Sequence, residues 1–217
     1  MGAQQSRPAP AWGEPAPGPA RRAVERIRAW FRPAPLPGPR PLRDLPAALR
    51  HGPQAEAYLE AERSNDHARA GAAAATAMDR AIVDEAWWPA DVWGHRALWH
   101  FERAGLEIES IHQARRIGEL RTAAGDAASA RRYFAEAIDE ARDVGAEHEQ
   151  GLATLGLGRA LLDLGRVTEA RRLGSAAVDL LVRADAPESE VAEARALLGR
   201  EVSVGEPTPA EHASGKA

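Results

Sequence analysis

The feature that most constrains this fold is a recurrence at a fixed interval in the second half of the chain, equal to the distance from Gly118 to Gly158. It aligns residues 117–141, "IGELRTAAGDAASARRYFAEAIDEA", with residues 157–181, "LGRALLDLGRVTEARRLGSAAVDLL". Both copies begin with a large aliphatic residue and a Gly, and both have a second Gly before the next helical segment. Two Ala residues then stand at matching positions in each copy. A constant interval of this kind is typical of stacked helical hairpins.

The side chains expected inside these hairpins are mostly small. Along residues 129–145, one side of the helical pattern is apolar and consists of Ala130, Phe134, Ala137, Ile138 and Ala141. The same small–large–small spacing occurs at Ala97, Phe101 and Ala104, and in weaker form at Ala170, Gly174 and Ala177. Small side chains let helix axes approach closely. We therefore expect neighbouring helices to nest, with Phe101 and Phe134 filling the space between hairpins.

The composition favours an all-α fold. Hydrophobic residues make up 44% of the chain and aromatic residues only 5%. Ala, a strong helix former, supplies much of the hydrophobic share, and β-branched runs are scarce. Glycines that adopt a positive φ end helices, which is the role expected of Gly105, Gly125, Gly145 and Gly165, and Pro89 marks a helix start. The predicted helices cover residues 53–63, 67–86, 89–104, 107–124, 126–145, 148–164, 167–184 and 188–201.

The N-terminal quarter differs from the rest, because eleven of the 16 prolines precede residue 47. We expect residues 1–52 to be a mostly disordered arm with a short basic amphipathic helix near 21–31, residues 53–201 to form the helical repeat domain, and residues 202–217 to be a disordered tail. The arm carries nine Arg against three acidic residues, a net charge of +6, whereas the remainder carries −10.

The basic segment of the arm, Arg21–Arg32, has three possible partners: an anionic membrane in weak peripheral contact, the acidic body, or another protein. The opening "MGAQQS" matches the N-myristoylation pattern. However, the Ala and Arg bias indicates GC-rich coding and a bacterial source, where this lipidation is not expected.

Ile117-Gly118, followed by Ala130, Phe134 and Ala137, resembles the tetratricopeptide-repeat (TPR) family, whose hairpins carry Leu-Gly in the first helix and Ala-x-x-x-Phe then Ala in the second. The second copy matches in part, since Gly174 replaces the aromatic residue. The family's usual first-helix Trp and Tyr are missing, and the interval is longer than the family's usual one. The resemblance covers about residues 66–200 and is specific over 111–184. It implies a right-handed α-solenoid of about three hairpins plus a capping helix.

The motifs for catalysis are missing. Without Cys there is no thiol nucleophile or thiolate metal site. The sequence "GLGRAL" at 156–161 lacks the third Gly of a dinucleotide loop, and "HEQGL" at 148–152 is not HExxH. The spacing of His95 and His100 places them on different sides of a helix. Most carboxylates have Arg neighbours at helical spacing, as on a solvated surface. We therefore expect no enzyme, no catalytic residue, no metal and no cofactor.

The TPR resemblance implies a concave groove, lined by the first helix of each hairpin, that takes a peptide or helix of another protein. The residues that it places there are His112, Arg115, Glu119, Thr122, Leu152, Leu155, Arg159, Leu162 and Arg195. An apolar strip flanked by Arg suits a partner with hydrophobic anchors and a carboxylate. The alternative is a regulatory or sensor module, similar to the TPR parts of bacterial transcription activators, that responds to a peptide or a small molecule.

Four tryptophans, at positions 87, 88, 93 and 99, lie close together in the segment "WWPADVWGHRALW". They either seal the core of the first hairpin or form an aromatic docking surface, for which Trp88 is the best candidate. The acidic body disfavours nucleic acid. No apolar run is long enough to span a membrane, and the N-terminus lacks the apolar segment of a secretory signal, so a cytoplasmic location is expected.

Overall fold

The computed structural model describes residues 53–199, all within the second of the chain's two units, Gly38–Ala217. The predicted N-terminal arm, its basic segment and the C-terminal tail lie outside the described residues. Between residues 53 and 199 the chain forms only α-helices. These are α3 (Pro53–Arg63), α4 (His67–Val83), α5 (Trp87–Ala104), α6 (Glu107–Ala123), α7 (Ala127–Val144), α8 (Glu147–Asp163), α9 (Val167–Arg183) and α10 (Glu188–Gly199). The helix predictions are confirmed, with each described boundary within three residues.

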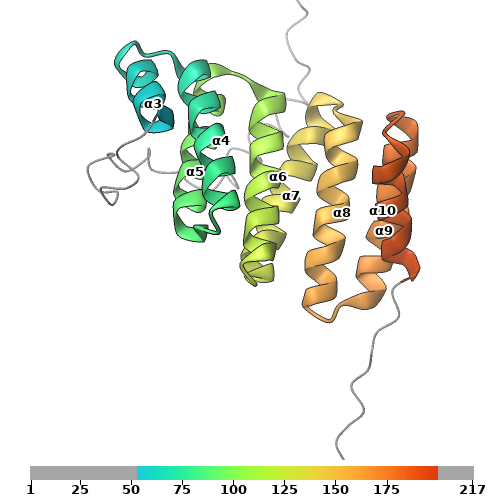
Figure 1. The fold of residues 1–217 in the computed structure, drawn as a ribbon. Coiled ribbons are helices and arrows are strands. Elements are labelled where there is room, and N and C mark those ends of the chain that lie inside the picture. Colours follow the sequence, from blue (N-terminus) through green and yellow to red (C-terminus); the bar gives the residue numbers. More distant parts are fainter. Residues whose placement is uncertain (1–52, 200–217) are drawn as a thin grey trace, which may run out of the picture. The chain divides into compact units, whose positions relative to one another are not determined.

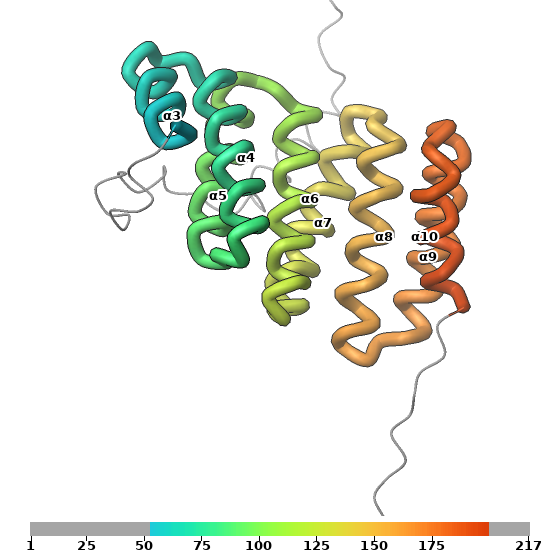
Figure 2. Tube along the Cα trace, viewed as in Figure 1, coloured from blue at the N-terminus to red at the C-terminus, as the bar shows by residue number. Residues whose placement is uncertain are grey.

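Each helix packs on the next one along the chain, and α8 also packs on both α6 and α10. Figures 1 and 2 show the helices side by side in chain order. The helices α4, α6, α8 and α10 follow one another in one layer, which we call the even layer, while α5, α7 and α9 lie behind them. One contact between α4 and α6 is a hydrogen bond of 3.0 Å from Gln113 Nε2 to Met78 Sδ. This consecutive packing is compatible with an α-solenoid.

The turns repeat at half the interval of the sequence recurrence. A residue with positive φ occurs at Asn65, Glu85, Gly105, Gly125, Gly145, Gly165 and Asp185. In each turn the next residue donates its backbone N–H to a carbonyl five positions back, as Ala86 does to Ala81 at 2.8 Å. This is the hydrogen-bond pattern of a Schellman turn. The four predicted Gly turns are confirmed. The predicted helix bounds also leave breaks around Asn65 and Asp185, but the positive φ of these residues was not predicted, and Glu85 falls inside the predicted helix 67–86.

Glu85 is the least suitable of these residues, because a left-handed conformation costs an L-residue roughly 1–2 kcal/mol and a Glu side chain gives no local compensation. We expect Glu85→Gly to raise the free energy of unfolding by about 1 kcal/mol in urea titrations. The matched reverse change, Gly105→Glu, places a Glu at a φ of 68° and should destabilise by a similar amount. Equal stability of the three proteins would contradict this account of the turns.

The small residues lie where the sequence predicts them. Ala130 and Ala137 are fully buried and Phe134 is 1% exposed. A Cβ added to Gly118 of α6 would lie 2.8 Å from the Phe134 ring, and one added to Gly156 of α8 would lie 2.3 Å from it. The ring therefore occupies space that only glycine leaves open, between its own hairpin and the next. In the first hairpin Phe101 has the same relation to Gly71, at 2.7 Å.

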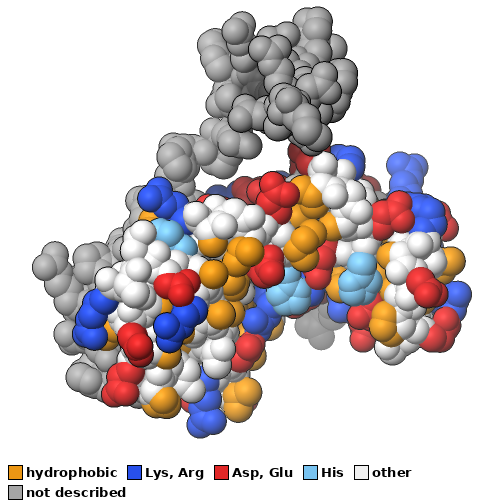
Figure 3. Space-filling view, turned by 90° about the horizontal axis from the view of Figure 1, so that it is seen from above, with side chains coloured by type: hydrophobic (Ala, Val, Ile, Leu, Met, Phe, Trp, Pro, Cys, Tyr) orange, Lys and Arg blue, Asp and Glu red, His pale blue; other side chains and the backbone are white. Residues whose placement is uncertain are grey.

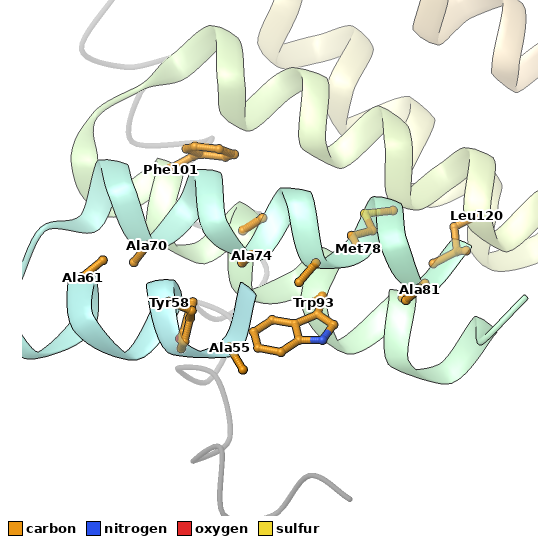
Figure 4. Packing of buried hydrophobic residues seen from close by; sticks show 13 residues of the cluster. Ala55, Tyr58, Ala61, Ala70, Ala74, Met78, Ala81, Trp93, Phe101 and Leu120 are labelled. Atoms are coloured by element: carbon orange, nitrogen blue, oxygen red, sulfur yellow. The ribbon is translucent and has the colours of Figure 1, made fainter. Parts of the chain in front are cut away.

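One member of the pattern was placed wrongly, because Ala104 is exposed in the last turn of α5. Ala104 is the last residue of α5, and the turn at Gly105 follows it directly. The tryptophans also divide between the two predicted roles. Trp93 is 3% exposed and belongs to the core shown in Figure 4, whereas Trp87 and Trp88 are 41% and 54% exposed.

Candidate interaction site

Ion pairs connect each helix of the even layer to the next helix in that layer. Asp79 of α4 pairs with Arg116 of α6. Between α6 and α8, Glu149 accepts hydrogen bonds from His112 and Arg115, and between α8 and α10 the pairs are His148–Glu190 at 2.6 Å and Arg159–Glu193 at 2.8 Å. On the face shown in Figure 3, acidic, basic and His side chains are mixed and do not gather into a patch of one sign. The surface of the even layer is thus largely neutralised by its own pairs.

The most buried of these joints is centred on Glu149. Its side chain is only 12% exposed, and it lies 2.9 Å from Nε of Arg115, whose side chain is 10% exposed. Burial raises the pKa of Glu149, but the hydrogen bond from His112 and the charge of Arg115 outweigh it and lower the pKa to about 2. Burial lowers the pKa of Arg115, and the carboxylates of Glu119 and Glu149 outweigh that effect and raise it. The joint is therefore a cation held between two carboxylates.

Most of the predicted partner-binding residues are already engaged inside the chain. His112 and Arg115 bind Glu149, and Glu119 accepts a hydrogen bond from Arg115. The hydroxyl of Thr122 donates to the Gly118 carbonyl at 3.0 Å. The remaining two cations have carboxylate partners, Glu193 for Arg159 and Glu188 for Arg195. A partner carboxylate would have to displace one of these internal acids.

The predicted apolar strip is narrower than expected. Leu155 is 2% exposed, so it belongs to the core and not to a groove surface. Leu152 and Leu162 are half-buried against the cluster that α8, α9 and α10 form around Leu181. The TPR resemblance placed these leucines in the groove, and it does not reveal that α9 and α10 cover this side of α8.

Unlike Leu155, Trp88 lies at the surface. The turn between α4 and α5 carries three of the large hydrophobic residues that are exposed in the described part of the chain: Val83 at 74%, Trp87 at 41% and Trp88 at 54%. We call these three residues the Trp turn. Between them, Asp84 is paired with Arg80 at 3.0 Å and Glu85 is exposed. Exposed tryptophans in a cluster mark interaction sites, because Trp is enriched among residues that dominate binding energy.

The sequence missed Glu149 as the partner of Arg115, although both residues stand in helices that were predicted correctly. The signal that could have found it is weak: the alignment of the two copies places the two residues on successive first helices. The described residues contain no group of three or more His, Cys, Asp or Glu that could hold a metal ion. His95 and His100 have separate partners, as their spacing predicted: Tyr133 for His95 and Tyr58 for His100.

None of the helices between residues 53 and 199 is both long enough and apolar enough to cross a membrane. No family model matches the chain, and no curated protein matches it at a significant level.

Proposed function

We propose that this chain is a non-enzymatic scaffold of TPR-like hairpins, a right-handed α-solenoid that binds another protein. The observation that carries the proposal is the Trp turn, where two indole rings and an isopropyl group stand in solvent although the core nearby is closed. Burying such side chains against a partner removes apolar surface from water at about 25 cal/mol per Å². The even layer supports the same proposal. Its surface carries paired charges, and protein interfaces commonly have a polar rim around an apolar centre such as the Trp turn.

The TPR resemblance implies that the partner binds in the concave groove, whereas we propose that most of the binding free energy comes from the Trp turn. In the groove, the cations and the leucines are held by intramolecular contacts, so a partner gains little from them without breaking internal pairs. At the Trp turn, the side chains of Val83, Trp87 and Trp88 are exposed in the described part of the chain, so a partner reaches them without breaking an ion pair there. The partner that fits is therefore a protein with an apolar recess. The groove residues, above all exposed Arg159, add only a small part of the binding free energy.

The test is affinity capture of partners from the native cell, with quantitative mass spectrometry, using the wild type and Trp87→Ala/Trp88→Ala. We expect the paired change to reduce recovery of the specific partner by about 30-fold or more, the loss associated with hot-spot residues. Stability should change little, because both side chains are at the surface. Val182→Ala is the matched control: its side chain is 55% exposed, on α9, and its recovery should equal that of the wild type. Equal recovery by the Trp variant would exclude the Trp turn as the site.

A further inference from the structure

A chain of buried polar contacts joins the first three described helices. The hydroxyl of Tyr58 in α3 donates to Glu62 Oε1 at 3.0 Å and lies 3.0 Å from Nε2 of His100 in α5. Nδ1 of His100 lies 2.9 Å from Nδ1 of His67 in α4. Arg96 adds a hydrogen bond of 3.2 Å from Nη1 to the Tyr58 oxygen. Tyr58 is fully buried and His100 is 1% exposed, so water does not compete for the contact between these two, whereas Glu62 is exposed and His67 is half-buried.

With a neutral His100, one arrangement of protons satisfies every contact in this chain. Tyr58 gives its single proton to Glu62, so Nε2 of His100 must carry hydrogen and donate to the Tyr58 oxygen. Nδ1 of His100 is then the acceptor of a proton from Nδ1 of His67. Burial, opposed by the charge of Arg96, raises the pKa of Tyr58 to about 12, so the hydroxyl keeps its proton. The arrangement thus requires a neutral His100.

Helix α3 depends on these contacts more than the other helices do. It has 11 residues, and its buried side chains are Ala55, Tyr58 and Ala61. Figure 4 shows them on the side of α3 that faces α4, with Trp93 beside Tyr58. Tyr58 is the only large side chain of the three, and a helix this short is not stable alone in water. A further polar contact with α4 is the exposed pair Glu60–Arg69, at 3.9 Å.

Protonation of His100 is incompatible with this arrangement. A proton on Nδ1 would face the proton that His67 donates, so that His67 would have to change tautomer or give way. The new charge would also stand beside the Arg96 guanidinium, while the carboxylate of Glu62 is one hydrogen bond further away, beyond Tyr58. Burial, then the charges of His67 and Arg96, lower the pKa of His100 to about 4.

We propose that the contact chain of Tyr58, His100 and His67 is a protonation-sensitive latch, which holds α3 on the α4–α5 hairpin near neutral pH and releases it in acid. Release leaves α6–α10 folded and uncovers the surfaces of α4 and α5 that Tyr58, Ala55 and Ala61 cover. The inference does not depend on the Trp turn, which lies at the other end of α4.

The direction of the pH effect follows from linkage. With the latch closed, the pKa of His100 is lower than its ordinary value of 6.5. Between these two pKa values the open state therefore binds a proton that the closed state does not bind. The stability of closure is therefore complete above pH 6.5 and is lost as pH falls toward 4. With one proton taken up, the opening constant rises about tenfold per pH unit in that window. Glu149, with a pKa of about 2, keeps its charge there, so the joint between α6 and α8 persists.

The test is amide hydrogen exchange of the full chain between about pH 6.5 and about pH 4.5, expressed as protection factors, which correct for the intrinsic effect of pH on exchange. We expect protection in α3 to fall by about 40-fold while protection in α8 stays constant. In His100→Gln, whose amide still donates and accepts but does not titrate, α3 protection should no longer depend on pH. His148→Gln removes a surface imidazole that pairs with Glu190 and should keep the wild-type response.

Three results would overturn the latch: constant α3 protection in the wild type, an equal and simultaneous loss in α3 and α8, or an unchanged pH response in His100→Gln. Because the first two are measured on the wild type, they decide the matter even if the variant folds poorly.

Discussion

Replacing Phe134 with Ala is expected to lower the free energy of unfolding by about 3–5 kcal/mol. The ring is 1% exposed and lies against Gly118 and Gly156, so no neighbouring side chain is placed to fill the space that it leaves. Urea unfolding followed by circular dichroism measures the loss through the shift of the midpoint.

A double-mutant cycle tests the position of the ring more sharply. Alone, Gly156→Ala should destabilise by about 1–3 kcal/mol, because its Cβ would lie 2.3 Å from the Phe134 ring. In the Phe134→Ala background the same change should be neutral or stabilising, since the clash is gone and Ala is the better helix former. Gly199→Ala is the control: an added Cβ meets nothing within 4 Å there, so the effect should be small in both backgrounds. An identical cost of Gly156→Ala in both backgrounds would show that the ring lies elsewhere.

Replacing Arg115 with Ala is expected to cost about 3–5 kcal/mol, since it strands the buried carboxylate of Glu149. Arg159→Ala, which removes an exposed partner of Glu193, should cost less than about 1 kcal/mol. Arg115→Met/Glu149→Leu should recover most of the loss, because replacing a buried pair with apolar side chains is often neutral. Thermal or urea unfolding of the four proteins provides the comparison, and equal costs for Arg115→Ala and Arg159→Ala would contradict the buried joint.

The Arg115 joint also has a pH signature. The pKa of Glu149 is lowered to about 2 from an ordinary value of 4.5, so the stability from its contacts is complete above 4.5 and is lost as pH falls toward 2. In Arg115→Ala that loss in acid should largely vanish. In binding studies, Arg115→Ala would lower the stability of the protein, so a loss of binding in this variant would not show that Arg115 contacts the partner. Arg159→Ala is the variant that tests the even layer without disturbing the core.

The helices and their ends could be predicted from the sequence, because the signals are local. A Gly with positive φ ends a helix wherever it stands, and the alternation of Ala with Phe134 marks the buried side of α7 within that helix alone. The same reasoning failed at Ala104, which continues the buried pattern to the last residue of α5 but is exposed. It located the breaks that contain Asn65 and Asp185 but not their positive φ, and it placed Glu85 inside a helix, since these residues lack the conformational signal of glycine.

The candidate site could be predicted only in part. Trp88 was predicted to be the best exposed candidate for docking, and its side chain is exposed, but the sequence left open whether other tryptophans of the segment, such as the buried Trp93, seal the core. Arg115 was expected to meet a partner's carboxylate and instead meets Glu149 of its own chain. Arg and Glu are equally compatible with a solvated surface and with a buried pair, and their identity alone does not distinguish the two.

By itself, the sequence determined which segments are helices, where they turn and which side of each is small, because backbone conformation and helical periodicity depend on near neighbours in the chain. Only the tertiary structure decided which polar groups meet: Arg115 with Glu149, and Tyr58 with His100 and His67. Those contacts join residues 33 to 42 positions apart, and they depend on the register and separation of whole helices. A shift of one helix by a single residue rotates its side chains by about 100°, which would leave the same sequence with different pairs.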